Sequence, residues 1–169
     1  MIIQNVCIIG GGLMGRQIAL NTAIYPFQVK LTDNAPAVRE NVRCWADDYL
    51  NGRIAKGRMS KEQVAEIKKR FSVVDTLEEA LADADLVIEA VVEREDVKRE
   101  LLRTVSDKVH PDTIIATNSS RICSSLFQNE VSNPQRLANL HYFNPALVMK
   151  LTEVVQGEHC SDETAQAPL

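Results

Sequence analysis

The chain has 169 residues, of which 45% are hydrophobic and 25% are charged, with a formal net charge of −4. This length fits one domain with a buried core and is too short for two domains of ordinary size. The slightly acidic balance gives no general attraction to nucleic acid or to an anionic membrane, and no stretch approaches the ~20 apolar residues of a membrane span.

Strands and helices are predicted in alternation along the chain. Short apolar runs predict strands over residues 6–9, 29–31, 71–74, 86–88, 113–116, 137–140 and 151–155. Apolar residues at helical spacing predict a helix from Leu13 that Pro26 ends, and further helices over 77–81 and 95–109. The stretch 36–70 predicts two helices, with a break near Gly57 and a restart at Ser60, where Gln63 completes a capping box.

This alternation is typical of an α/β fold with a doubly wound, mostly parallel sheet. We expect one domain over residues 1–169. After Val155 the chain is polar, and a helix that starts at Ser161 does not develop. We therefore expect the domain to be truncated near its C-terminus. The chain begins without a basic leader, so no signal or transit peptide is expected.

The four cysteines are widely scattered, and no histidine joins them at metal-ligand spacing. We interpret them as reduced, small apolar residues, which favours a reducing compartment such as the cytoplasm. Neither a disulfide scaffold nor a bound metal is expected.

The most informative motif lies between the first predicted strand and the first predicted helix. Residues 10–15 read Gly-Gly-Gly-Leu-Met-Gly and fit the pattern G-x-G-x-x-G of Rossmann-type dinucleotide sites. In that pattern the first glycine permits a tight turn, the second lets the backbone approach the pyrophosphate, and the third allows close helix packing. We expect the cofactor to contact Gly10, Gly12, Leu13, Met14 and Gly15.

An acidic residue is expected about 20 residues farther on, at the end of the second strand, where it binds the adenine-ribose hydroxyls. Asp33 stands there. Because its carboxylate would repel a 2′-phosphate, NAD is favoured over NADP. A glycine-rich turn without a nucleotide is the competing interpretation, and the conjunction with Asp33 makes it the weaker one.

Three polar groups follow predicted strands at the edge where such sheets bind ligands. His141 suits removal of a hydroxyl proton, because the ordinary pKa of histidine is near neutrality, and Glu153 on the next strand suits its second nitrogen. A capping or half-buried histidine is the alternative. Ser120 and Asn144 suit hydrogen bonding to a substrate oxygen, but turn chemistry favours the same residue types.

Several stretches together resemble the N-terminal domain of the 3-hydroxyacyl-CoA dehydrogenases, and the bacterial 3-hydroxybutyryl-CoA dehydrogenases in particular. The stretches are Gly-x-Gly-x-Met-Gly at 10–15, Asp-Leu-Val-Ile-Glu-Ala-Val-Val-Glu at 85–93, Thr-Asn-Ser-Ser at 117–120, His-Tyr-Phe-Asn-Pro at 141–145 and Met-Lys-Leu-x-Glu at 149–153. The similarity runs from about Val6 to Thr164. The block at 141–145 and its Met-Lys-Leu-x-Glu partner are far more specific than the glycine motif.

The resemblance implies NAD-dependent oxidation of (S)-3-hydroxyacyl-CoA to 3-ketoacyl-CoA, or the reverse reduction, as in fatty-acid β-oxidation. It implies that His141 is the catalytic base, that Glu153 pairs with it, and that Ser120 binds the substrate's 3-oxygen. Asn144 matches a residue near nicotinamide and substrate, while Ser120, Asn144, Glu93, Lys98 and Asp33 would line the cofactor site.

A net-basic segment agrees with a CoA substrate. Residues 53–70 contain seven basic residues and two acidic ones. Such a segment in an acidic protein suits the CoA phosphates, although a solvated helix face explains it equally well. By resemblance, Lys56 is the CoA contact.

The chain departs from the family pattern in three ways. Arg121 replaces a second small hydroxyl residue beside Ser120, which affects acyl-chain specificity, and Tyr49 replaces a CoA-contacting serine. Family members also continue into a helical domain that closes the acyl site and through which full-length relatives form homodimers, and this domain is not in the chain. The isolated chain is therefore expected to be poorly active.

Two further hypotheses remain open. In one of them, the chain acts on the same acyl group carried by an acyl carrier protein instead of CoA. In the other, the chain is a structural or binding protein that keeps the nucleotide pocket without turnover, and the presence of His141 and Glu153 argues against it.

Overall fold

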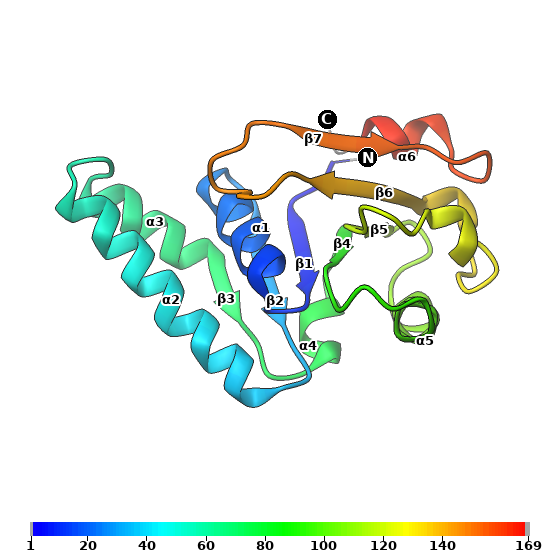
Figure 1. Ribbon diagram of the computed structural model, residues 1–169, viewed down its shortest axis with the longest axis horizontal. Coiled ribbons are helices and arrows are strands. Elements are labelled where there is room, and N and C mark those ends of the chain that lie inside the picture. The colour runs from blue at the N-terminus through cyan, green and yellow to red at the C-terminus, as the bar shows by residue number, and fades with distance from the viewer. Residues whose placement is uncertain (1, 168–169) are drawn as a thin grey trace.

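The computed structural model describes residues 2–167, which form a seven-stranded sheet flanked by helices (Figure 1). The strands are β1 (Asn5–Ile9), β2 (Gln28–Thr32), β3 (Phe71–Val73), β4 (Leu86–Glu89), β5 (Ile114–Thr117), β6 (Leu137–Tyr142) and β7 (Thr152–Val155). The helices are α1 (Leu13–Ile24), α2 (Pro36–Ala55), α3 (Lys61–Arg70), α4 (Leu77–Leu81), α5 (Glu95–Lys108) and α6 (Asp162–Gln166). Two short 3₁₀ helices, η1 (Ser124–Phe127) and η2 (Pro134–Arg136), lie between β5 and β6.

The strand order is β3-β2-β1-β4-β5-β6-β7. All neighbouring pairs are parallel except β6 and β7, which are antiparallel. The order reverses between β1 and β4, and open α/β sheets bind ligands at the carboxyl edge beside such a switch point. The doubly wound, mostly parallel Rossmann sheet that the sequence predicts is thus confirmed.

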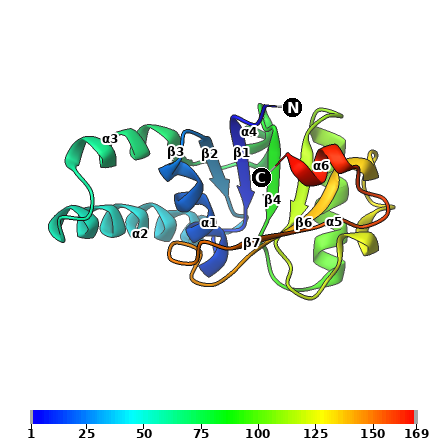
Figure 2. The same ribbon diagram turned by 90° about the horizontal axis from the view of Figure 1, so that it is seen from above.

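Helices cover both faces of the sheet, because its central strands are apolar on both sides. In β1, Val6 and Ile8 pack in the same core as residues of α1, α2 and α3, whereas Cys7 and Ile9 pack with residues of α4 and α5. Figure 2, viewed from above, shows α2 and α3 running side by side and extending beyond the sheet. This pair therefore forms an arm whose tip is the turn between the two helices.

Local signals set the helix boundaries where the sequence predicts them. Gly57, with a φ of 63°, follows the end of α2, and Ser60 caps α3 through the predicted capping box with Gln63. The predicted strands agree with the observed ones within two residues at each end. The two 3₁₀ helices were not predicted, and α6 develops to five residues from its Ser161 cap. None of the helices in residues 2–167 is long and apolar enough to cross a membrane.

Candidate functional site

The glycine loop between β1 and α1 has the backbone geometry of a dinucleotide-binding turn. Gly10 has a φ of 109°, which residues with a side chain rarely adopt, and a Cβ there would lie 2.6 Å from the carbonyl oxygen of Ala90. A Cβ on Gly15 would lie 1.9 Å from the carbonyl oxygen of Gly10, so α1 packs against the loop more closely than any other residue allows. A Cβ on Gly12 would meet nothing within 4 Å, so the loop is open there.

The start of α1 is suited to bind an anion. Gly12 is its N-cap residue, and in the described part of the chain no side chain caps it. The first N–H groups of a helix have no partners within the helix and lie at the positive end of its dipole. Leu13 is exposed and Met14 is half-buried, and both lie beside this opening. A pyrophosphate bound here would accept hydrogen bonds from these N–H groups.

Asp33 lies at one end of the opening, directly after β2. One carboxylate oxygen accepts a hydrogen bond from Gly11 N (2.8 Å), and the other accepts one from Ala35 N (2.9 Å). The carboxylate lines a cavity of about 550 Å³, together with Gly12, Val38 and Val92 among others. Backbone N–H groups therefore fix Asp33 before any ribose binds.

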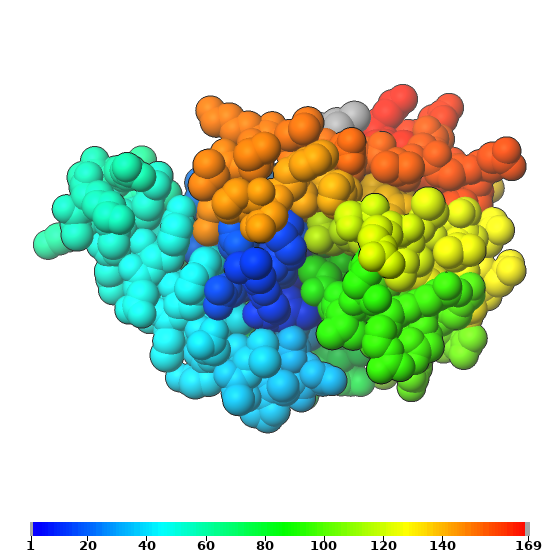
Figure 3. Space-filling model, in the orientation of Figure 1, coloured from blue at the N-terminus to red at the C-terminus, as the bar shows by residue number. Residues whose placement is uncertain are grey.

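A second cavity, of about 330 Å³, continues from the first. Gly12 and residues 90–92 line both, and the second is also lined by Leu13, Met14, Glu93, Lys98, Asn118 and Ser119. Figure 3 shows the start of α1 (dark blue) in a hollow between α2 (cyan), the segment after β6 (orange) and the loops after β4 and β5 (green and yellow). The two cavities form one groove along the carboxyl edge of the sheet.

A buried ion-pair network lies beneath the second cavity. Lys98 Nζ donates to both carboxylate oxygens of Glu89, at 2.7 and 2.8 Å, and lies 3.3 Å from a carboxylate oxygen of Glu93. The Lys98 and Glu89 side chains are 1% and 0% exposed, whereas that of Glu93 is 37% exposed. Glu89 also accepts hydrogen bonds from Thr117 Oγ1 (2.7 Å) and Val91 N (2.7 Å).

Glu93 is the end of this network that reaches the groove. Its carboxylate accepts a hydrogen bond from the Ser119 hydroxyl and is paired with Lys98. Partial burial raises the pKa of this carboxyl, but the Ser119 hydrogen bond and the Lys98 charge outweigh burial and hold the pKa below its ordinary value. Glu93 and Lys98, both predicted to line the cofactor site, are thus brought together at the groove.

His141 and Glu153 face each other across β6 and β7. They are directly paired in the antiparallel ladder, and His141 Nδ1 lies 3.0 Å from Glu153 Oε2. The His141 side chain is 22% exposed, and that of Glu153 is 52% exposed. With Nδ1 bound to the carboxylate, Nε2 is the nitrogen that remains to take a proton. The predicted pairing of these two residues therefore exists in the fold.

The other two predicted catalytic residues stand apart. Ser120 and Asn144 are exposed and, within residues 2–167, form no side-chain hydrogen bond with each other or with His141. None of the three lines the groove cavities. The link is Asn118, which lines the second cavity and whose Oδ1 accepts a hydrogen bond from Tyr142 N at 2.9 Å. His141 therefore precedes Tyr142, whose backbone N–H contacts a residue that lines the groove.

Two buried polar residues were missed by sequence reasoning. Glu89 belongs to one of the stretches that resemble the family, but no role was predicted for it. The signal that could have identified it is an acidic residue at the end of an apolar strand. Asn139 is buried in β6, accepts a hydrogen bond from Ser124 N and donates to the carbonyls of Ser119 and Ile122. It fixes the loop that carries Ser120 to the strand that carries His141.

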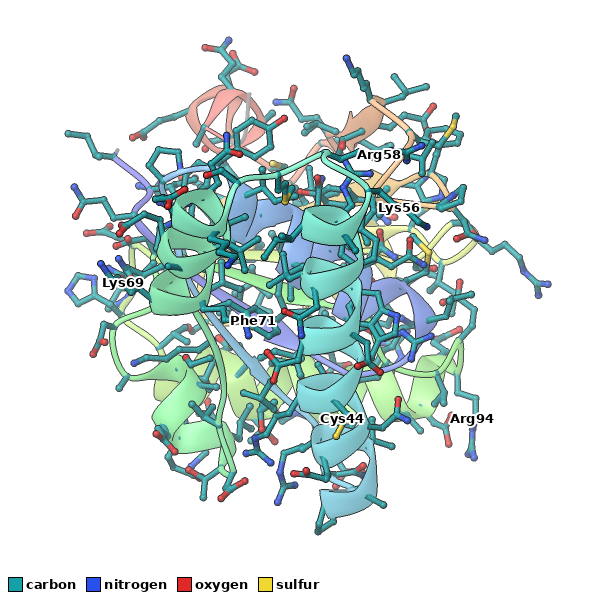
Figure 4. The ribbon with its side chains drawn as sticks, turned by 90° about the vertical axis from the view of Figure 1, so that its left-hand side faces the viewer. Cys44, Lys56, Arg58, Lys69, Phe71 and Arg94 are labelled. Atoms are coloured by element: carbon teal, nitrogen blue, oxygen red, sulfur yellow. The ribbon has the colours of Figure 1, made fainter. Side chains whose placement is uncertain are left out.

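The basic segment is divided between structural pairs and a free tip. Lys68 pairs with Asp47, Lys69 pairs with Glu66, and Arg70 donates to carbonyls at the end of α1. In the described residues Lys56, Arg58 and Lys61 make no ion pair and are exposed. Figure 4 shows Lys56 and Arg58 together at the tip of the α2–α3 arm, with Lys69 on the other side of α3.

Two aromatic rings lie farther back along α2, with Arg53 between them and the tip. Trp45 and Tyr49 stack with their centroids 5.8 Å apart, and the Arg53 guanidinium lies 5.9 Å from the centroid of Tyr49. Arg53 Nε is buried and has no hydrogen-bond partner in the described residues. Tyr49, which departs from the family serine, is therefore part of a cationic and aromatic surface. Within residues 2–167, no cluster of three or more His, Cys, Asp or Glu residues is suited to hold a metal ion.

Comparison with known proteins finds one family over nearly the whole chain. Residues 5–168 match the family described as 3-hydroxyacyl-CoA dehydrogenase, NAD binding domain. The chain is 40% identical over 155 residues to a 3-hydroxyadipyl-CoA dehydrogenase of Escherichia coli K12, a match that covers 92% of this chain and 32% of that protein. It thus spans about a third of the length of this curated relative.

Solved structures agree with the fold. A 3-hydroxybutyryl-CoA dehydrogenase from Escherichia coli K12 superposes with a TM-score of 0.93 at 38% identity, over 98% of this chain and 35% of that one. An (S)-3-hydroxybutyryl-CoA dehydrogenase from Ralstonia eutropha also gives a TM-score of 0.93, at 30% identity, over 98% of this chain and 58% of that one.

Proposed function

The chain belongs to the NAD-binding domain family of the 3-hydroxyacyl-CoA dehydrogenases, and we propose that it supplies the cofactor domain and the catalytic His141–Glu153 pair of such an enzyme. The reaction is the NAD-dependent interconversion of (S)-3-hydroxyacyl-CoA and 3-ketoacyl-CoA. The observation that carries the proposal is the 3.0 Å contact between His141 on β6 and Glu153 on β7, with β6 joined to the groove through the hydrogen bond from Tyr142 N to Asn118.

The residues of the groove fit NAD. The open position at Gly12 and the uncapped start of α1 suit the pyrophosphate, and Asp33 suits the adenine-ribose hydroxyls. Glu93 and Lys98 suit the nicotinamide half, because they line the cavity at the other end. When bound, NAD supplies the acceptor for the hydride that leaves carbon 3 of the substrate.

His141 acts as the general base in the oxidation. Its Nε2 takes the proton of the 3-hydroxyl group, and Glu153 holds the ring through Nδ1 and stabilises the imidazolium that forms. In the reverse reduction the same nitrogen returns the proton to the oxygen. Ser120 and Asn144, both of which are exposed, donate hydrogen bonds to the substrate oxygen.

The CoA part of the substrate binds at the C-terminal end of α2 and the turn that follows it. Lys56 and Arg58 are free cations at the tip of the arm, and Arg53 presents a guanidinium over Tyr49. Cations of this kind suit phosphates. The tip is thus a site for the nucleotide end of CoA rather than for the thioester.

Two further parts of the proposal concern the surroundings of the protein. The four cysteines are free, which fits a reducing compartment such as the cytoplasm. The resemblance implies that full-length relatives form homodimers, and we propose the same for the protein that contains this domain.

A single-turnover experiment tests the proposed function. The chain, in molar excess over the substrate, is mixed with NADH. Acetoacetyl-CoA is then added, and the loss of nicotinamide absorbance is followed. Slow loss that disappears in the His141→Gln variant is expected. Loss with acetoacetyl on an acyl carrier protein, and none with acetoacetyl-CoA, would contradict CoA as the carrier. NADH binding without any loss, in a form of the protein with an enclosed acyl site as well as in this chain, would support the structural alternative instead.

A further inference from the structure

Glu89 is a charged residue at a place in the sheet where its neighbours are apolar. It ends β4, it is 0% exposed, and the preceding residues Val87 and Ile88 are buried hydrophobic side chains. Burial of an ionised carboxylate is costly unless it is paired and hydrogen-bonded. Hydrophobic residues of similar volume often replace a buried ion pair without loss of stability, so the fold alone does not call for an acid here.

The contacts of Glu89 reach both partners of Glu93. Lys98 Nζ is bound to both oxygens of Glu89 and pairs with Glu93 on its other side. The second connection runs through Thr117, whose Oγ1 donates to Glu89 and accepts a hydrogen bond from Ser119 N at 3.3 Å. The Ser119 hydroxyl in turn binds Glu93. Both side chains that hold Glu93 are therefore anchored on one buried carboxylate.

Glu89 itself does not line the groove, whereas Glu93, Lys98 and Ser119 do. All three line the cavity opposite the Asp33 end, and none of them lines the cavity around Asp33. A change at Glu89 would therefore act on one half of the groove and leave the other half in place.

We propose that Glu89 is a positioning residue for the nicotinamide half of the cofactor, which it orients through Lys98 and Ser119 by fixing the Glu93 carboxylate. The inference rests on the proposed function, because it takes NAD as the ligand of the groove. Two ligands separate the halves: NADH needs both, whereas ADP occupies only the end at Asp33 and the start of α1.

The test is the Glu89→Gln variant, titrated with NADH and with ADP. Glutamine has nearly the same shape but no charge, and its amide group adds donors where Lys98, Thr117 and Val91 already donate. We expect NADH affinity to fall at least about tenfold, the effect of losing one hydrogen bond to a charged group. ADP affinity should remain within about twofold, because no contact of Asp33 changes.

Glu130→Gln is the matched control. Glu130 is also a largely buried acid paired with α5, through Arg99 and Arg103, but it does not line the groove cavities. This variant should bind both ligands as the unchanged chain does. If it loses NADH affinity as much as Glu89→Gln does, ion pairing along α5 in general is responsible and the role of Glu89 is overturned.

Should Glu89→Gln fail to fold, Thr117→Val removes the link from Glu89 to Ser119, leaves the Lys98–Glu89 pair intact and changes no residue that lines the groove cavities. The folded Thr117→Val variant should bind ADP normally and bind NADH more weakly. A folded variant of either kind that binds NADH normally, or that loses ADP and NADH equally, would show that Glu89 only supports the fold. If the unchanged chain binds no NADH at all, the proposed function fails instead, so the two failures are distinguishable.

Discussion

The two ends of the candidate site differ in how firmly the fold holds their polar groups. At the cofactor end, both oxygens of Asp33 accept backbone hydrogen bonds, and Glu89 and Lys98 are almost completely buried. At the end formed by β6 and β7, Glu153 is 52% exposed, and Ser120 and Asn144 are exposed without a side-chain hydrogen bond in residues 2–167. The dinucleotide therefore meets a preformed groove, whereas the substrate meets one fixed pair and open surroundings.

The largest effect expected from this difference concerns turnover by the chain alone. Steady-state reduction of acetoacetyl-CoA should be poor or undetectable, because water reaches the His141–Glu153 pair and weakens the interactions made there. NADH binding by the same sample should be normal. A spectrophotometric assay beside an NADH titration checks both, and ordinary saturating turnover would show that the exposed end needs no further enclosure.

The next largest effect separates chemistry from cofactor binding. In an active form of the protein, His141→Gln should lower kcat by about 10²–10⁴-fold, the usual contribution of a general base, and leave NADH affinity unchanged. Glu153→Gln should lose part of the same rate. Because the two residues act as a unit, the double variant should be hardly slower than His141→Gln. Defects that multiply in the double variant would mean that the two residues act independently.

A smaller effect is expected at the other end. Asp33→Ala should weaken NADH by about 1.5–3 kcal/mol, the cost of hydrogen bonds to a charged group, and should narrow the difference between NADH and NADPH. Fluorescence titrations of both cofactors measure it. Turnover at saturating NADH should hardly change in an active form. A lower kcat at saturation would break the separation between the two ends.

How much of this site was visible in the sequence follows from how each residue is held. Asp33 and the glycine loop belong to a motif with a fixed spacing, a glycine-rich turn followed about 20 residues later by an acid, so the spacing predicts them although Gly11 holds Asp33 across 22 residues. His141 and Glu153 were paired because successive strands were assigned correctly. The partners of Glu89 lie on α5 and β5, up to 28 residues away, so only the folded sheet shows that its charge is satisfied.

The loop that carries Ser120 was harder still to predict. Its course depends on buried hydrogen bonds from Asn139, 20 residues farther along the chain, and on η1, which carries no strong periodic signal. The sequence likewise did not show which basic residues are free, since Lys68 finds its partner on a neighbouring helix.

The smallest expected effect is a change in stability at acidic pH. Glu93 has a lowered pKa in the folded chain, so it contributes stability that is fully present above its unfolded value of about 4.3 and is lost as the pH falls through the folded value. The stability difference between the unchanged chain and Glu93→Gln should therefore shrink below about pH 4. Urea unfolding at several pH values measures it, and a constant difference would mean that the network does not depend on this charge.

The central claim is that this chain is an NAD-binding domain whose groove is complete without a substrate. Its most direct test is a pair of titrations of the unchanged 169-residue chain, with NADH and with NADPH, followed by nicotinamide fluorescence. We expect saturable NADH binding at least about tenfold tighter than NADPH binding, because the fixed Asp33 carboxylate faces the position of the 2′-phosphate. Equal affinity for the two cofactors, or no binding of NADH, would contradict the claim.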